Sequence, residues 1–315
     1  MMIPGQQMST PAAANGIPYD GSERYGEVFD RGYQHYEGSR HGRAGSIWAL
    51  TRFSMARAMG LKKSWTAKVI PILVYIGATM TAIIPIGIES FTGQVVMPYD
   101  QFFNIIFLLI GVFVATIAPE MLCGDRRENV LSLYFSRPIT RLDYVLAKLL
   151  ATALLTLTVT FIPAFVLWLG RNLLADSPLS SLGNNLDDLG RIALAGTLIA
   201  FFLGAGGLMI ASFTGRKAIA VAVTIVGFLV LETLANTLLQ VVPHRWENLV
   251  ILLSPSNTIS AFLARLFPGA ETSGISNPDV VFSLGLYPVE GYIAFLVGMV
   301  VVGIGVILSR YLPER

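Results

Sequence analysis

Long apolar stretches alternate with short polar intervals along most of the chain, and each approaches the roughly 20 residues that a helix needs to cross a bilayer. The short segments of alternating polarity that mark a membrane β-barrel are not found. The pattern predicts an all-α membrane protein whose transmembrane domain covers residues 66–315. Its six predicted transmembrane helices cover about residues 69–88, 102–122, 145–169, 192–213, 218–242 and 289–309.

Two segments precede the first predicted span. Residues 1–45 are rich in Gly, Ser, Pro and Tyr and lack an apolar core, so we expect a disordered cytoplasmic tail without a cleavable signal peptide. In residues 46–65, Ile47, Leu50 and Phe53 recur near helical spacing among Arg and Lys residues. This pattern predicts an interfacial amphipathic helix, and the alternative is a basic tail without fixed structure.

The apolar segment 246–267, before the last span, is interrupted in its middle. Pro255 and its polar neighbours divide it into halves that are each too short to cross a bilayer. We therefore predict a re-entrant segment of two short helices on the outer side, since irregular backbone at membrane depth must be buried in protein. A seventh crossing is the alternative, and Arg310 and Arg315 argue against it because it would place them outside.

Composition and charge agree with this picture. Hydrophobic residues make up 54% of the 315 positions and charged residues 13%, against about 25% charged in soluble domains. Fourteen Lys and Arg residues flank the predicted spans on the side that includes residues 124–148, and four lie on the other side. The positive-inside rule therefore places both termini in the cytoplasm. The single cysteine, Cys123, excludes an intramolecular disulfide.

The most informative polar interval is the coupling segment, residues 124–144, between the second and third predicted spans. Residues at spacings of three and four predict a short helix with an apolar face and a basic end. That face carries Val130, Leu133, Tyr134 and Arg137. Pro138 ends the helix because it lacks an N–H, and Thr140 with Asp143 predicts a capping box that starts the third span. We interpret the segment as a docking element, and an ordinary loop that only sets topology is the alternative.

The run GDRRENVLSLYFSRPITRLDYVLAK (residues 124–148) resembles the coupling-helix region of ABC-type exporter permeases, which move drugs, polysaccharides and lipids. The resemblance rests on the corner at residues 136–141 (SRPITR) and on the Ala-Lys pair at 147–148. Residues 33–43 also resemble a leader of some bacterial members, whereas Asn129-Val130 stands where many members have Gly-Thr. The resemblance implies that nine residues couple to an ATPase: Arg126, Arg127, Glu128, Leu131, Leu133, Tyr134, Arg137, Pro138 and Arg141.

The same resemblance implies a permease subunit of an ATP-driven exporter in a bacterial inner membrane. Its expected partners are an ATP-binding subunit, membrane lipid, and a second copy or a related permease, because six spans are half of the usual twelve. Nucleic acid is not expected. No Gly-x4-Gly-Lys-Ser/Thr loop occurs, so we expect no cofactor in this chain, with ATP and Mg²⁺ in the partner. Short outer loops and few charges in the spans favour a hydrophobic or amphipathic cargo.

Glu120, Glu232 and Asn236 are polar residues inside predicted spans. Glu232 stands in the outer half of the fifth span, and Asn236 shares its helix face. They are expected either to line the transport path or the re-entrant segment, or to bond a neighbouring helix. An ion-coupled secondary transporter that uses Glu232 is thus the alternative function. Glu120, at the inner end of the second span, is expected to anchor the coupling segment through Arg126 or Lys148.

Catalysis finds little support in the sequence. The three histidines, His35, His41 and His244, lie in the tail or an outer loop, and none stands at a metal-binding spacing. No nucleophile has a general base beside it. We therefore expect neither an enzyme nor a metal site in this chain, and a membrane scaffold without transport activity is the third possibility.

Overall fold

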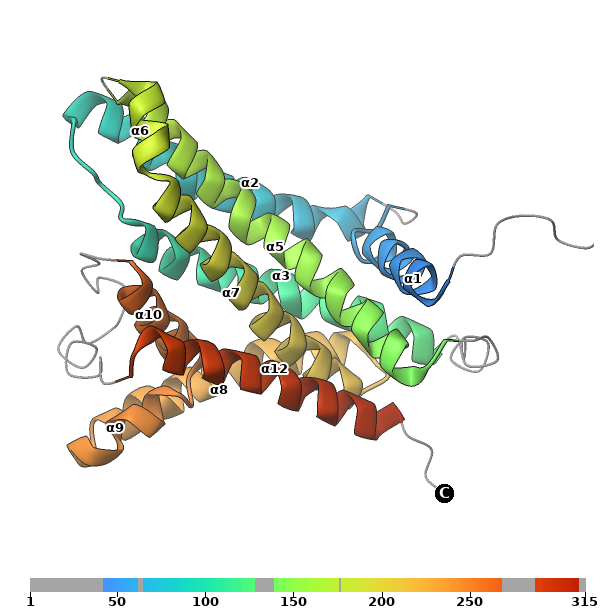
Figure 1. Cartoon of the computed structure of the whole chain (residues 1–315). Coiled ribbons are helices and arrows are strands. Elements are labelled where there is room, and N and C mark those ends of the chain that lie inside the picture. The colour runs from blue at the N-terminus through green and yellow to red at the C-terminus, as the bar shows by residue number, and fades with distance from the viewer. Residues whose placement is uncertain (1–41, 62–64, 128–138, 176, 268–286, 312–315) are drawn as a thin grey trace, which may run out of the picture. The chain divides into compact units, whose positions relative to one another are not determined.

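The computed structural model describes residues 42–61, 65–127, 139–175, 177–267 and 287–311, and the regular structure within these ranges is helical, without strands (Figure 1). The helices are α1 (Arg43–Ala58), α2 (Thr66–Thr92), α3 (Tyr99–Arg127), α5 (Arg141–Leu174), α6 (Pro178–Asn184), α7 (Leu186–Ser212), α8 (Lys217–Leu239), α9 (His244–Ile251), α10 (Pro255–Leu266) and α12 (Val289–Tyr311).

Within the described residues, six helices are long and apolar enough to cross a bilayer, namely α2, α3, α5, α7, α8 and α12. This finding confirms the predicted all-α membrane protein with six spans. Helix α5 has 34 residues, more than the roughly 20 that a bilayer requires. Its first turn therefore carries polar residues beyond the apolar span.

Different short helices lie at the two ends of the helix bundle. We call the end where α3 finishes at Arg127 and α5 begins at Arg141 the coupling end. The opposite end, where α2 finishes at Thr92 and α3 begins at Tyr99, is the distal end. Figure 1 shows α1 at the coupling end and α6, α9 and α10 at the distal end.

Helices α3, α5 and α7 form the centre of the bundle. Their most apolar windows are 61%, 56% and 61% buried, against 28%, 17% and 22% in α2, α8 and α12. Close approach at the centre depends on a small residue: a Cβ on Gly207 of α7 would lie 2.5 Å from Val114 of α3. The outer helices leave apolar faces exposed, as suits contact with lipid or with another membrane helix.

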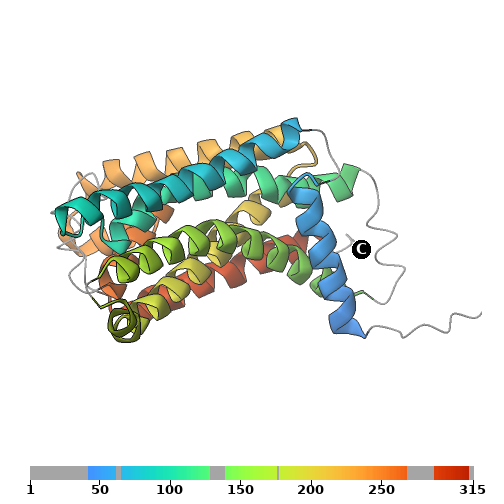
Figure 2. The same cartoon turned by 90° about the horizontal axis from the view of Figure 1, so that it is seen from above.

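Helix α1 crosses the other helices at the coupling end (Figure 2). It packs against α3 and α5 and begins before the predicted interfacial segment, while the tail, residues 1–41, lies outside the described residues. Thr51 is buried and donates a hydrogen bond of 3.3 Å to the carbonyl of Ala147. One side of α1 is thus buried against the bundle, whereas the aromatic side chains of Trp48 and Phe53 are exposed.

Helices α9 and α10 are separated by a break after Ile251, within the predicted re-entrant segment. Ser254 is the N-cap of α10, since its hydroxyl accepts a hydrogen bond of 3.2 Å from the Asn257 amide. Pro255 occupies the first turn, where a missing N–H has no cost. Both helices are too short to span a bilayer, and α10 packs against α3, α8 and α12.

Candidate coupling site

The described residues include the base of the coupling segment. Arg126 and Arg127 end α3, and Arg141 starts α5. The other residues that the sequence assigns to coupling lie outside the described residues: Glu128, Leu131, Leu133, Tyr134, Arg137 and Pro138. The structure therefore shows how the segment is held at its two ends.

Helix α1 bridges those two ends with an arginine near each of its own ends. Arg43 contacts both carboxylate oxygens of Asp143 in the first turn of α5, at 2.7 and 2.9 Å to Oδ1 and 3.0 Å to Oδ2. Arg57 Nη1 contacts Asp125 Oδ1 in the last turn of α3 at 2.9 Å. One helix thus contacts both of the helices that flank residues 128–138.

Asp125 is the centre of a buried ionic cluster, which also contains Arg57, Tyr144 and Lys148. Its Oδ2 accepts a hydrogen bond of 2.8 Å from the Tyr144 hydroxyl and lies 2.7 Å from Lys148 Nζ. The side chains of Asp125 and Lys148 are 0% and 1% exposed. Burial of two charges has a large desolvation cost, so the cluster holds only while every partner is present. It joins α1, α3 and α5.

The start of α5 is fixed by local hydrogen bonds. Thr140 Oγ1 accepts from the Asp143 amide at 3.2 Å, and Asp143 Oδ2 accepts from the Thr140 amide at 3.1 Å. This arrangement confirms the predicted capping box. Asp143 also holds Arg43, and its hydrogen bond and charge raise the pKa of Arg43 above its usual value. Thr140 therefore leads directly into helix α5.

Gly124 allows Arg57 to reach Asp125. A Cβ at this position would overlap the Arg57 guanidinium. The guanidinium would have to move away, because a terminal nitrogen cannot share that space with a methyl group. The Arg57–Asp125 contact therefore depends on the absence of a side chain at Gly124.

Glu120 lies one and a half turns before Asp125 on α3 and has a different partner. It forms an ion pair of 2.5 Å with Lys217, the first residue of α8. Of the two partners that the sequence suggests for Glu120, Arg126 and Lys148, the structure places Lys148 beside Asp125, 2.7 Å from its Oδ2. Arg126 donates a hydrogen bond of 2.6 Å to the Ser212 carbonyl at the end of α7. Both contacts tie the end of α3 to the α7–α8 connection.

The chain was compared with known protein families. The sequence model of a family described as "ABC-2 family transporter protein" matches residues 4–313, nearly the whole chain. The chain belongs to the ABC-2 transporter family. No curated protein matches the sequence. The family match confirms the resemblance found at residues 124–148 and shows a permease, the membrane component of a transporter.

In this ABC-2 permease, Glu232 and Asn236 on α8 face the start of α10. Glu232 Oε2 accepts a hydrogen bond of 2.7 Å from the hydroxyl of Ser254, the N-cap of α10. Asn257 Nδ2 donates to Asn236 Oδ1 at 3.1 Å. Of the roles left open by the sequence, the contacts correspond to hydrogen bonds that position the short helix α10.

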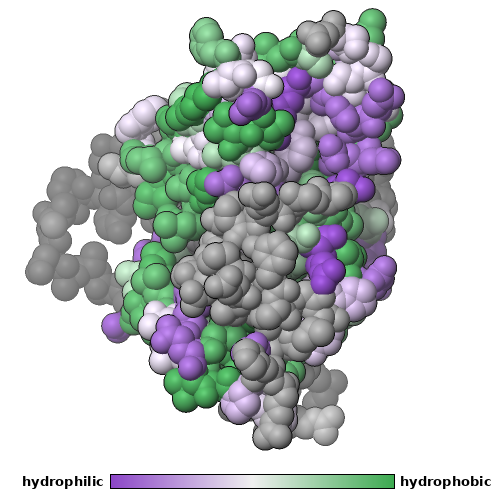
Figure 3. All heavy atoms as spheres, turned by 90° about the vertical axis from the view of Figure 1, so that its left-hand side faces the viewer, coloured by the Kyte–Doolittle hydropathy of each residue, from purple (hydrophilic) through white to green (hydrophobic). Residues whose placement is uncertain are grey.

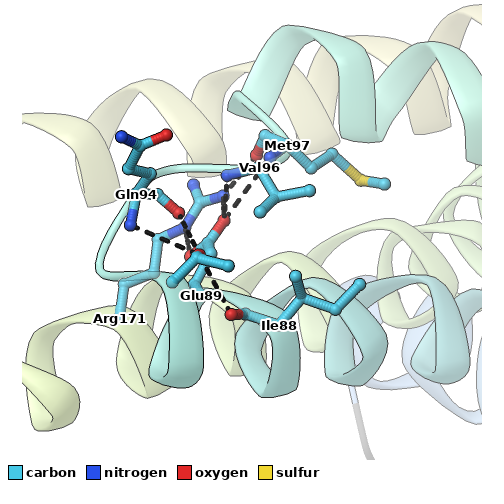
Figure 4. A network of polar contacts seen from close by, with 7 residues as sticks. Ile88, Glu89, Gln94, Val96, Met97 and Arg171 are labelled. Atoms are coloured by element: carbon cyan, nitrogen blue, oxygen red, sulfur yellow. Dashed lines mark hydrogen bonds and ion pairs between the residues drawn. The ribbon is translucent and has the colours of Figure 1, made fainter.

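The permease has a second charged network, at the distal end, which the sequence analysis missed. Arg171 of α5 makes two contacts of 2.7 and 2.8 Å with Glu89 of α2 and also donates to the Met97 carbonyl (Figure 4). Glu89 Oε1 accepts a hydrogen bond of 3.0 Å from the Val96 amide, and Arg171 Cζ lies 4.7 Å from the centre of the Tyr99 ring. A carboxylate and an arginine at the same end of two predicted spans were the available signal.

Proposed function

We propose that the chain is the membrane-spanning subunit of an ATP-driven exporter, energised by a separate ATP-binding subunit that docks on the coupling segment. ATP, Mg²⁺ and hydrolysis belong to that partner, and this chain has no catalytic role. The observation that carries the proposal is the buried cluster of Arg57, Asp125, Tyr144 and Lys148 at the base of the segment.

The cluster supplies what a coupling element needs, which is a stiff connection to the spans. A docked subunit would push on residues between Arg127 and Arg141. Because α1, α3 and α5 are joined at that base, the push would move helices rather than deform a loop. Helix α5 has 34 residues and at 1.5 Å per residue is about 50 Å long, so a small tilt at the coupling end becomes a larger displacement at the distal end.

Orientation and assembly are parts of the same proposal. The excess of Lys and Arg near the coupling end places it, with both termini, on the cytoplasmic side of a bacterial inner membrane. A second copy, or a related permease, would complete the transport path. The poorly buried α2, α8 and α12 offer apolar faces for that partner and for lipid. The cargo would be hydrophobic or amphipathic.

Ion-coupled transport through Glu232 has less support. A carrier carboxylate must exchange its partner with water during each cycle. Glu232 instead accepts a hydrogen bond from the cap of α10 and stands 3.4 Å from the Asn236 amide nitrogen. These contacts favour a positioning role for Glu232.

The test is purification of the tagged chain from native membranes in mild detergent, followed by mass spectrometry of bound proteins. We expect a stoichiometric ATP-binding subunit, and its loss when Arg137→Glu and Arg141→Glu are combined. An acidic residue in the first turn of α5 suits the helix dipole, so the fold should persist. Arg265→Glu, exposed at the distal end, is the matched charge control. Unchanged assembly of the double variant would refute the docking assignment.

A further inference from the structure

A polar cavity of about 390 Å³ lies at the distal end, away from the coupling site. It is bounded by the ends of α3, α5, α6, α7 and α10 and by the connection before α3. Its lining combines charged, amide and aromatic residues, among them Tyr99, Asp100, Arg171, Asn185, Asp188 and Arg191. Figure 3 looks onto the distal end and shows hydrophilic residues gathered on one side of it, beside hydrophobic ones.

Both arginines of the lining have a carboxylate partner. Arg171 is held by Glu89 at 2.7 and 2.8 Å. Arg191 lies 3.2 Å from Asp188 on the same helix. Because each positive charge is matched by a negative one, these four residues leave the cavity close to neutral.

The amide and hydroxyl groups of the lining are also satisfied. Asn172 Oδ1 accepts hydrogen bonds of 2.7 Å from Ser181 and 2.7 Å from Asn185. Asn172 Nδ2 donates 2.8 Å to the Trp168 carbonyl. This wall of the cavity is therefore fixed without a ligand, and α6 is held against the end of α5.

Asp100 is the exception. It is 2% exposed, and its Oδ1 has no hydrogen-bond partner among the described residues. It stands in the first turn of α3. No described cation forms an ion pair with it. A buried acceptor without a donor is unfavourable, so this carboxylate is available to a donor that the described residues do not provide.

The chemistry of the missing donor follows from the surroundings. It should carry one positive charge, to match the one unbalanced carboxylate, and at least one N–H. A divalent metal ion fits poorly, because no group of three or more His, Cys, Asp or Glu that could hold one occurs among the described residues. Pro98, Val95 and Phe267 add an apolar wall.

We propose that the distal cavity binds the primary ammonium group of an amphipathic ligand, with Asp100 as its counter-ion. This ligand would be a cargo of the transporter, so the proposal rests on the proposed export function. Two sources share this chemistry: the headgroup of an aminophospholipid and a water-soluble amphipathic amine. In both, the N–H groups bond to Asp100 while the apolar part follows the apolar wall.

The first experiment uses the purified full chain in nanodiscs of phosphatidylcholine, whose headgroup has no N–H. Octylamine should raise the melting temperature saturably, whereas octyltrimethylammonium, which has the charge without an N–H, should not. Asp100→Asn should weaken octylamine binding at least tenfold. Asp187→Asn is the matched control, since Asp187 also lies in the first turn of a helix, is exposed, and does not line the cavity.

The second experiment separates the two sources. In nanodiscs containing phosphatidylethanolamine, native mass spectrometry should show one retained aminophospholipid that Asp100→Asn loses and octylamine displaces, if the lipid is the ligand. If octylamine binds equally with and without phosphatidylethanolamine, the ligand is a soluble amine. Either result supports the ammonium site.

Equal binding of octylamine and octyltrimethylammonium to the unmodified protein would overturn the proposal, even if Asp100→Asn failed to fold. So would unchanged octylamine binding by a folded Asp100→Asn variant, which would leave Asp100 as a helix-stabilising charge only. No ATP-binding subunit is needed for these measurements. A negative result is therefore distinct from failure of the docking test.

Discussion

The coupling end and the distal end both join distant helices through buried charges, but they differ in completeness. At the coupling end, Asp125 is matched by Arg57, Lys148 and Tyr144 on three sides. At the distal end, Glu89 and Arg171 are matched, whereas one oxygen of Asp100 has no hydrogen-bond partner among the residues that the structure describes. The charged groups of the coupling end bond to one another, whereas the distal end has a carboxylate oxygen that is available to a ligand.

Burial also differs between the two ends. Asp125 and Lys148 are 0% and 1% exposed, whereas Glu89 and Arg171 are 9% and 13% exposed. Solvent near the distal pair weakens its attraction and lowers its desolvation cost. Removal of one partner should therefore be more damaging at the coupling end, where the remaining charge cannot reach water.

The largest effect is expected from Lys148→Met. The substitution leaves Asp125 buried with one cationic partner fewer, and the free energy of unfolding should fall by about 3–5 kcal/mol. Unfolding of the purified chain in detergent micelles measures this loss. The matched control is Lys217→Met: Lys217 is 54% exposed in its pair with Glu120, so its loss should be about 1 kcal/mol or less.

Adding Asp125→Asn to Lys148→Met should lower the stability further, because Arg57 then loses the carboxylate with which it is paired. Equal losses for Lys148→Met and Lys217→Met would show that the buried pair does not anchor the base of the coupling segment. The contrast between the two ends would then have no energetic basis.

Arg171→Met should give an intermediate effect at the distal end. It removes charge-assisted hydrogen bonds to Glu89 and a donor to the Met97 carbonyl, for a loss of about 2 kcal/mol. The same unfolding assay applies, with Arg191→Met as control, because Arg191 is 34% exposed in its pair with Asp188. If the two variants were equally stable, the α2–α5 connection would contribute no more than a surface pair.

Local patterns and distant contacts differ in how far the sequence reveals them. The spans follow from apolar length, and the capping box follows from Thr140 and Asp143 three positions apart, where helix geometry alone brings them together. Arg57 and Asp125 are 68 positions apart, and Glu89 and Arg171 are 82 apart. Their meeting depends on helix packing, which a single sequence does not specify.

In the candidate coupling site, too, the sequence located the segment but not the contacts between distant residues. The sequence identified residues 124–144 and suggested Arg126 or Lys148 as the partner of Glu120, because all three lie near the same end of the predicted spans. Several basic residues share that end, and charge alone does not select among them. Helix packing buries Asp125 with Lys148 and directs Glu120 toward Lys217. The sequence likewise identified Glu232 as a polar residue in a span, but it did not identify Ser254 as its hydrogen-bond partner.

The smallest effect is expected from Arg43→Gln, at the rim of the coupling end. Arg43 is 63% exposed, so its pair with Asp143 is open to solvent and to salt. The variant should lower the melting temperature slightly at low ionic strength and not at 1 M salt, where the screening length is about 3 Å. Arg57→Gln, whose side chain is 17% exposed, should keep its effect at high salt.

Matching losses for the two variants at 1 M salt would mean that α1 is held with equal strength at both ends. Helix α1 would then be a rigid brace that fixes the gap between α3 and α5. The expected difference implies instead that α1 stays attached to α3 through Arg57 while its Arg43 end separates from α5 more readily. A subunit that docks on the coupling segment would therefore move α3 and α5 together, because Asp125 of α3 contacts Tyr144 and Lys148 of α5, and the exposed Arg43–Asp143 contact would yield first.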